Sequence, residues 1–190
     1  MNKLRTPWTE KKVLLALFGA ILLIKGCLFL WAAACFNFSV QGEQNWLSIW
    51  DRWDSYWYQM IAVSGYSPIG MDEQSKAFMS HFPPFYPFLI RVCASVFFIS
   101  ARDAGFLLSF IFGLASSYLI YWLVIRDFQN QQMAVLAVLL FNLYPVAYFT
   151  NTIYSEALFT FLTLLAFCLL RQKHFVLPGL LNGIKLAVNS

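Results

Sequence analysis

The chain has 190 residues, of which 60% are hydrophobic and only 12% are charged. Soluble domains carry about 25% charged residues, and the mean hydropathy of this chain is +0.63. This much apolar surface cannot be hidden from water in a chain of this size, so the composition predicts an all-α integral membrane protein. The net charge of +4 gives no reason to expect a nucleic-acid partner.

The first apolar segment follows a short basic stretch. Residues 1–12 carry four lysines and arginines, and residues 13–36 form an uninterrupted run of 24 residues except for Lys25. About 20 residues suffice to span a bilayer, so we expect a cytoplasmic N-terminus followed by a transmembrane helix. The alternative is a cleaved signal peptide, with Ala32-Ala33-Ala34-Cys35 as a lipoprotein-type cleavage site. The length of the run and the apolar segments that follow favour the transmembrane helix.

Lys25 lies near the middle of this first span. An ammonium group at that depth is costly unless it faces the interior of a helix bundle or a wet cavity. We therefore expect an interior partner for Lys25, with snorkelling toward the headgroups as the alternative.

Residues 37–103 are predicted to form an outer loop, and the motif of residues 50–66 is its most informative part. It combines Asp51 and Asp54 with several aromatic residues. The spacing predicts a surface-lying amphipathic helix over residues 51–64, with Trp53, Trp57 and Ile61 on its apolar face. Asp51 is a plausible N-cap, Asp54 a first-turn carboxylate that favours the helix dipole, and Gly65 a C-cap.

Residues 82–100 form an apolar segment that begins with Pro83, Pro84 and Pro87 and contains Arg91. The prolines oppose a continuous helix at its start, and the arginine opposes burial in lipid. We expect this segment to lie on the outer face without crossing. Further spans are expected over residues 104–125, 132–149 and 157–170, and the apolar run 175–188 comes near the end of the sequence.

The distribution of basic residues distinguishes a topology in which residues 82–100 cross the membrane from one in which they do not. If residues 82–100 do not cross, seven basic residues lie on the cytoplasmic side: Lys3, Arg5, Lys11, Lys12, Arg126, Arg171 and Lys173. If the segment crosses, the cytoplasmic set is Lys3, Arg5, Lys11, Lys12 and Arg102. The first arrangement agrees better with the positive-inside rule, and it places Glu156 on the same face as Asp54.

Three blocks follow one another in a fixed order and spacing. They are Trp53-Asp54 with Ile61-Ala62 and Gly65-Tyr66, then Phe82-Pro83 to Pro87, then Tyr154-Ser155-Glu156-Ala157-Leu158-Phe159. Together they resemble the second mannosyltransferase of GPI-anchor synthesis and its prokaryotic relatives, within the GT-C class of polytopic glycosyltransferases. The resemblance covers residues 45–183.

The resemblance implies a multi-pass enzyme of a bacterial inner membrane or of the endoplasmic reticulum. Such enzymes take a sugar from a polyprenyl-phosphate donor and transfer it with inversion to a hydroxyl of a lipid or glycan acceptor. It implies Asp54 as the catalytic carboxylate and Glu156 as a second acidic residue of the site. No cofactor is implied with certainty, and a divalent metal is a possible participant.

Several other side chains are candidates for substrate contact. Aromatic rings offer flat surfaces to a sugar or isoprenoid, although interfacial belts place such rings at the membrane surface anyway. Arg91 is a candidate partner of the lipid phosphate, with snorkelling as the alternative. The full set of substrate-binding candidates is Asp51, Arg52, Trp53, Trp57, Tyr58, His81, Arg91 and Tyr154.

The end of the sequence departs from the family pattern. Past Gly183 the family continues with a basic arginine before another glycine, whereas this chain reads Ile184-Lys185-Leu186. We therefore expect a C-terminally truncated member that is inactive alone. The competing interpretations are a non-catalytic membrane scaffold and a transporter fragment. The transporter is disfavoured because the sequence shows no inverted repeat.

Overall fold

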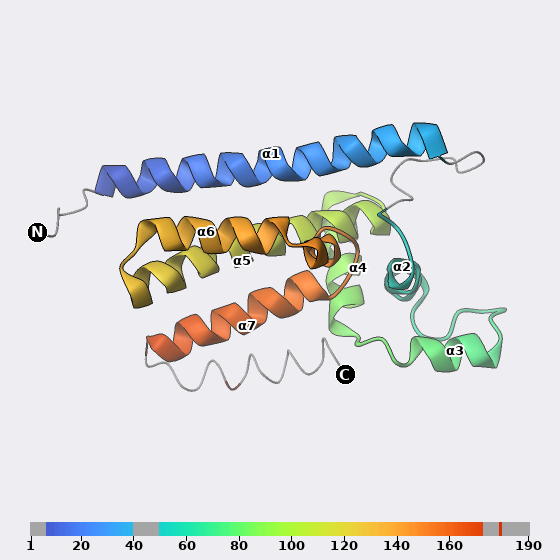
Figure 1. Cartoon of the computed structure of the whole chain (residues 1–190). Helices are drawn as coiled ribbons and strands as arrows, with labels where there is room; N and C mark the ends of the chain where they lie inside the picture. Colours follow the sequence, from blue (N-terminus) through green and yellow to red (C-terminus); the bar gives the residue numbers. More distant parts are fainter. Residues whose placement is uncertain (1–6, 40–49, 173–178, 180–190) are drawn as a thin grey trace, which may run out of the picture.

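The computed structural model describes residues 7–39, 50–172 and 179, and in these parts of the chain the regular elements are all helical. Figure 1 shows two long helices, α1 (Pro7–Ser39) and α5 (Ala101–Phe128). Both contain a stretch long and apolar enough to cross a membrane. The predicted all-α class is confirmed, and the apolar run 175–188 lies outside the described residues.

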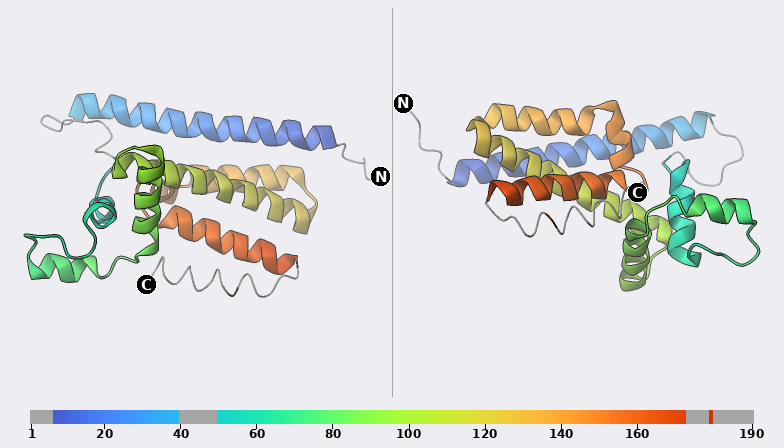
Figure 2. Two further views of the ribbon diagram at one scale, coloured as in Figure 1. Left: turned by 180° about the vertical axis from the view of Figure 1, so that it is seen from behind. Right: turned by 90° about the horizontal axis from the view of Figure 1, so that it is seen from below.

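Four helices run side by side as a bundle: α1, α5, α6 (Gln131–Leu143) and α7 (Glu156–Arg171). α5 is central, because it packs against both α6 and α7. The start of α1, the turn between α5 and α6, and the end of α7 lie at one end of the bundle (Figures 1 and 2). At this end the Arg171 guanidinium pairs with the Asp127 carboxylate at 3.0 Å.

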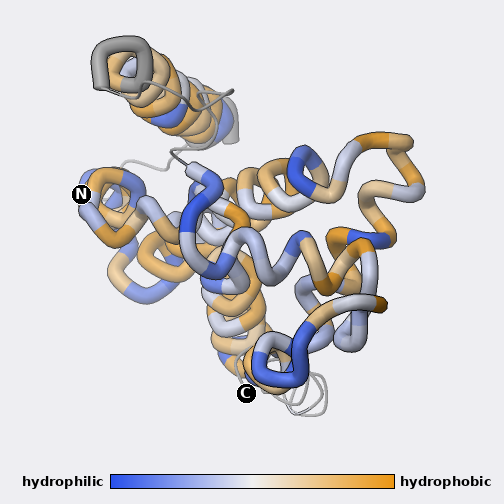
Figure 3. The backbone as a smooth tube through the Cα atoms, turned by 90° about the vertical axis from the view of Figure 1, so that its right-hand side faces the viewer, coloured by the Kyte–Doolittle hydropathy of each residue, from blue (hydrophilic) through white to orange (hydrophobic). Residues whose placement is uncertain are grey.

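The other end of the bundle carries three short helices: α2 (Asp54–Ser64), α3 (Glu73–Met79) and α4 (Phe85–Phe97). Figure 3 looks onto this end, where hydrophilic stretches of backbone alternate with hydrophobic ones. α4 lies across the direction of α5 (Figures 1 and 2). Its 13 residues span about 20 Å at 1.5 Å per residue, less than the roughly 30 Å hydrocarbon layer. That geometry supports a segment that does not cross, which stays a prediction.

The expected single span over residues 132–149 is wrong. α6 ends at Leu143, and a 3-10 helix, η2 (Pro145–Thr150), follows it. Pro145 has no backbone N–H and cannot continue an α-helix, so the chain turns there toward α7. The polar turn before α6 is also shorter than expected, because α5 continues to Phe128 and Asn130 caps α6 by accepting from the Met133 N–H at 3.1 Å.

Two details of the predicted surface helix are corrected. α2 begins at Asp54, so Asp51 is not its N-cap; Trp53 stands there and makes no side-chain capping bond. The buried face is formed by Ser55, Tyr58, Ile61 and Ala62 rather than by the expected line of Trp53, Trp57 and Ile61. Gly65 ends the helix as expected, with a φ of 76° that glycine adopts without strain.

The link between η2 and α7 approaches α5 very closely at Gly105. A Cβ added there would lie 2.5 Å from Ile153 Cγ2, and Ile153 is fully buried. Gly105→Ala is therefore expected to destabilise the protein by about 1–3 kcal/mol, in the range of overpacked cores. Thermal unfolding in detergent measures this loss.

Gly113→Ala is the matched control on the same helix. A Cβ at Gly113 meets the Thr150 carbonyl oxygen at 3.5 Å and Lys25 Nζ at 3.6 Å, and both are ordinary contacts. Alanine is favoured over glycine inside a helix by roughly 0.5–1 kcal/mol, so this variant should unfold at the wild-type temperature or above. Equal losses in both variants would contradict the close packing at Gly105.

Candidate active site

Two segments about 100 residues apart in the sequence are joined by hydrogen bonds: the start of α2 and the link 151–155 that precedes α7. The Tyr58 hydroxyl lies 2.9 Å from Ser155 Oγ, and Ser55 Oγ lies 3.3 Å from Thr152 Oγ1. Thr152 Oγ1 also donates to the carbonyl oxygen of Trp50. All these side chains are buried, so the two segments form one unit.

α5 holds the same link from the opposite side. Ser109 Oγ donates to the carbonyl oxygen of Thr152 at 2.6 Å, and the Tyr86 hydroxyl lies 2.9 Å from Ser109 Oγ. Tyr86 and Thr152 are completely buried. Because buried polar groups are costly unless they are paired, this network fixes the link against both α2 and α5.

The network brings two carboxyl groups within electrostatic reach of each other. Asp54 is half-buried in the first turn of α2, and Glu156 begins α7. Burial raises the pKa of Asp54. Burial is also the main cause of the raised pKa of Glu156, and the negative charge of Asp54 raises it further. Glu156 is therefore the carboxyl group of the pair whose pKa is raised both by burial and by its neighbour's charge.

This coupling gives a pH prediction. Asp54→Asn removes the negative charge but not the burial, so the pKa of Glu156 should fall while staying above its ordinary value. An infrared titration of the protonated carboxyl band checks this, with the band assigned by its loss in Glu156→Gln. Asp51→Asn is the control and should leave the Glu156 titration in place. An unchanged titration in Asp54→Asn would show that the two groups do not interact.

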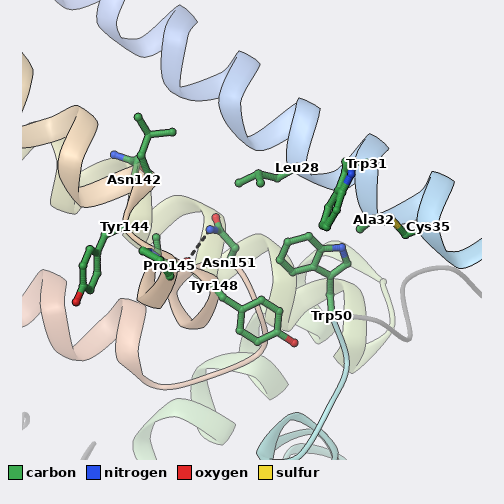
Figure 4. A pocket seen from close by; sticks show the side chains of 12 residues that line it. Leu28, Trp31, Ala32, Cys35, Trp50, Asn142, Tyr144, Pro145, Tyr148 and Asn151 are labelled. Carbon is green, nitrogen blue, oxygen red and sulfur yellow. Dashed lines mark hydrogen bonds between the residues drawn. The ribbon is translucent and has the colours of Figure 1, made fainter. Parts of the chain in front are cut away.

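Two hollows flank η2. The first, of about 490 Å³, has mostly apolar walls and includes Glu156 and Thr160. Glu156 is exposed toward this hollow, whereas protein surrounds its other sides. The second, of about 450 Å³, lies between α1 and η2 and is lined by aromatic and amide side chains, among them Trp31, Trp50 and Asn151 (Figure 4).

Lys25 connects α1 to this region. Its side chain is only 4% exposed, and its ammonium group donates to Asn151 Oδ1 at the end of η2. Asn151 in turn donates from Nδ2 to the carbonyl oxygen of Ala147 at 2.7 Å. The prediction of an interior partner for Lys25 is confirmed, and the partner is a neutral amide.

A family model described as dolichyl-phosphate-mannose-protein mannosyltransferase matches residues 81–183, more than half of the chain. The chain belongs to this family. The comparisons with curated proteins and with solved structures match nothing at a significant level. The match establishes the broad mannosyltransferase relationship that the sequence motifs suggested, and it covers Glu156 but not Asp54.

Three charged or polar candidates lie in contacts that explain them without substrate. In this mannosyltransferase-family chain, Asp51 pairs with Arg102 at 3.3 Å and accepts from Gln59 Nε2 at 2.6 Å. The guanidinium of Arg91 donates to the carbonyl oxygens of Ala62 and Ile61 at 2.6 and 3.3 Å, at the C-terminal end of α2. A cation is favoured at that end of a helix. His81 contacts Phe78 at the end of α3.

The aromatic candidates divide into buried and open ones. Tyr58 is buried between the rings of Phe82 and Tyr86, each 5.1 Å away and edge-on. Trp57 packs on Phe78 with ring centroids 5.1 Å apart. Trp53 is 69% exposed beside Asp54, and it is the aromatic candidate that remains open to a ligand next to the carboxylates.

Arg52 and Tyr154 lie directly at the start of α2. The carbonyl oxygen of Arg52 accepts from the Tyr154 hydroxyl at 3.4 Å, and the same hydroxyl accepts from the Asp54 N–H at 3.2 Å. Burial raises the pKa of Tyr148, which lies in η2, and the positive charge of Arg52 acts in the opposite direction and lowers it. These two candidates are thus brought to Asp54.

Sequence reasoning missed the polar residues that hold the site together. Ser109, Asn151 and Thr152 stand in or beside apolar segments, where an unpaired polar group is expensive. That property is the signal that marks them, although the sequence alone does not say which partners they meet. Among the described residues, no group of three or more His, Cys, Asp or Glu side chains is arranged to hold a metal ion.

Proposed function

We propose that this protein transfers a sugar from a polyprenyl-phosphate donor to an acceptor hydroxyl, with inversion at the anomeric carbon. The sugar that we propose is mannose. Within the mannosyltransferase family, we propose an activity like that of the second mannosyltransferase of GPI-anchor synthesis, on the resemblance of the motifs around Asp54 and Glu156. The observation that supports the proposal is that hydrogen bonds join the start of α2, which carries Asp54, to the link 151–155, which leads into Glu156, and that the charge of Asp54 raises the pKa of Glu156.

The proposed chemistry uses Asp54 as the base. The acceptor oxygen forms a bond to the anomeric carbon as its proton passes to the Asp54 carboxylate, and the bond from that carbon to the phosphate oxygen breaks. The electron pair of the broken bond leaves with the polyprenyl phosphate. Burial raises the pKa of Asp54, which makes its ionised form a stronger base than an exposed aspartate.

Glu156 is proposed as the second acidic residue of the site. The raised pKa of Glu156 favours its protonated form, which would donate a hydrogen bond to a sugar hydroxyl, whereas an ionised Asp54 would accept one. Paired carboxyl groups with separated pKa values divide such roles in many enzymes. The apolar hollow beside Glu156 suits the hydrocarbon chain of a lipid-linked substrate, and the exposed ring of Trp53 suits the apolar face of a sugar.

The test is sugar transfer by the purified protein in vesicles, supplied either with a polyprenyl-phosphate sugar or with the matching nucleotide sugar. We expect a product from the polyprenyl-phosphate donor alone, with its anomeric configuration inverted. Transfer from the nucleotide sugar, or retention of configuration, would overturn the proposal. The assay is run on the 190-residue chain and on any longer natural form, and an inverted product from either form supports the proposal.

A further inference from the structure

The backbone immediately before Asp54 adopts a conformation that its residue disfavours. Trp53 has φ 50° and ψ −113°. These angles are close to those of the second residue of a type II′ turn, a position that glycine dominates. The Ser55 N–H bonds to the carbonyl oxygen of Arg52 at 3.2 Å, as such a turn requires. A tryptophan persists in this conformation only where its surroundings hold it there.

The hydroxyl of Tyr154 makes hydrogen bonds to the backbone on both sides of Trp53. It donates to the carbonyl oxygen of Arg52 at 3.4 Å, before Trp53, and accepts from the N–H of Asp54 at 3.2 Å, after Trp53. The first N–H groups of a helix have no partner within the helix, and Trp53 supplies no side-chain cap to α2. The hydroxyl therefore supplies, from a distant part of the chain, the cap that the local sequence lacks.

Tyr154 is itself rigid enough to act as a clamp. It is only 4% exposed, and its ring packs against Phe149 with centroids 5.3 Å apart. Burial raises the pKa of Tyr154 to about 12, and the charges of Asp54 and Glu156 are among the causes. The phenol thus keeps its proton at neutral pH and can donate it to the Arg52 carbonyl oxygen.

We propose that Tyr154 is a positioning residue: its hydroxyl holds the disfavoured turn at Trp53 and so fixes the direction in which α2 presents the Asp54 carboxylate. The inference rests on the proposed function for its effect on turnover. Its structural part, the clamp across Trp53, stands independently of any activity.

The first experiment measures hydrogen exchange of the Asp54 amide in the full chain. Tyr154→Phe removes the hydroxyl and keeps the ring, so the Asp54 amide should exchange at least about tenfold faster, while amides inside α2, such as that of Ile61, keep their rates. Unchanged exchange at Asp54 would overturn the clamp. This result does not depend on sugar transfer, so it separates failure of the clamp from failure of the proposed function.

The second experiment is a double-mutant cycle on turnover. Glycine accepts the angles of residue 53 without strain, so the clamp matters less in a Trp53→Gly background. We expect Tyr154→Phe to lower kcat by about tenfold in the wild-type background and by about threefold or less in the Trp53→Gly background, a coupling within the range for residues in contact. Trp53→Gly itself should raise the KM for the donor, because it removes the ring proposed to contact the sugar, whereas Tyr154→Phe should change the KM little within either background.

Tyr58→Phe is the matched control for that cycle. It removes another buried tyrosine hydroxyl that joins α2 to the link, at 2.9 Å from Ser155 Oγ, but this hydroxyl does not bracket Trp53. Its effect on kcat should be the same with and without Trp53→Gly. If Tyr154→Phe were likewise equally costly in both backgrounds, Tyr154 would have only a general structural role and the inference would fail.

Discussion

Replacing Asp54 with asparagine is expected to lower turnover by about 10²-fold or more, the range for loss of a general base. Asparagine has the same shape but cannot take up the acceptor proton. The backbone N–H of residue 54 keeps its bond to the Tyr154 hydroxyl, so α2 should still form and expression should be intact. Initial rates of sugar transfer from a polyprenyl-phosphate donor measure the effect.

Asp51→Asn is the matched control, three residues earlier on the same segment. Asp51 pairs with Arg102 at 3.3 Å and accepts from Gln59, contacts that anchor the segment but do not involve Glu156. Both side chains of the ion pair are partly exposed, so loss of the pair should lower the free energy of unfolding by about 1 kcal/mol or less. Turnover should change little. Near-normal transfer by Asp54→Asn, or an equal loss in both variants, would remove Asp54 from the proposed role.

Replacing Asn151 with leucine is expected to destabilise the protein by about 3 kcal/mol or more, because a buried charged group left without its hydrogen-bond partner costs more than a neutral one. Lys25 is buried in α1, and Asn151 Oδ1 accepts its hydrogen bond. Leucine offers no acceptor, so the ammonium group would remain in an apolar environment. Unfolding in mixed micelles on titration with a denaturing detergent measures the loss.

Lys25→Met removes the ammonium charge but keeps an unbranched side chain of similar length, so it distinguishes the effect of the charge from that of packing. This variant leaves the amide oxygen of Asn151 without its donor, which costs about 1–3 kcal/mol, less than an orphaned ammonium group. Combining Lys25→Met with Asn151→Leu removes both polar partners, so the double variant should recover much of the stability lost in Asn151→Leu alone. A double variant that is less stable than either single one would show that the two side chains do not act as a pair.

The elements that the sequence predicted well are those governed by local rules. The length and hydropathy of α1 and α5 follow from composition, and the end of α2 at Gly65 follows from the freedom of glycine at positive φ. The interior position of Lys25 follows from the cost of burying a charge. Each of these features depends on neighbouring residues or on the solvent, and none of them requires knowledge of distant partners.

Two of the errors arise where tertiary contacts override the local pattern, and the third arises from a local effect that hydropathy leaves out. Asp51 looks like an N-cap, but its pairing with Arg102 draws it away and α2 begins at Asp54. The run 132–149 looks like one span because hydropathy does not register that Pro145 breaks the helical hydrogen-bond pattern. The apolar face of α2 was misplaced because burial follows contacts of Tyr58 with Ser155 and Tyr86, which periodicity does not contain.

The sequence motifs single out residue types for the candidate site, but they do not contain the way in which the chain assembles it. The motifs pointed to Asp54 and Glu156, whereas the bonds that unite them involve Thr152, Ser109 and Tyr154, each far from Asp54 in the sequence or on another helix. Long-range pairings of single hydroxyl groups leave no periodic signal. They emerge only when α2, α5 and the link are placed together.

We propose that Asp54 and Glu156 form one site on the outer face of the membrane, with the basic helix ends in the cytoplasm. Cysteine labelling by a membrane-impermeant reagent tests it most directly, in a background without the four native cysteines. Gln74 on α3 reports the end that carries the site, and Gln129 and Gln172 report the opposite end of the bundle; all three are exposed. Thr152 is too deeply buried to serve as a reporter.

In intact cells a cysteine at Gln74 should react, whereas cysteines at Gln129 and Gln172 should be protected and should react only after the membrane is permeabilised. Protection of Gln74 with labelling of Gln129 and Gln172 would place the carboxylates in the cytoplasm. Labelling of all three in intact cells would mean that the bundle between them does not cross the membrane. Either result would contradict transfer from a lipid-linked donor at the outer face.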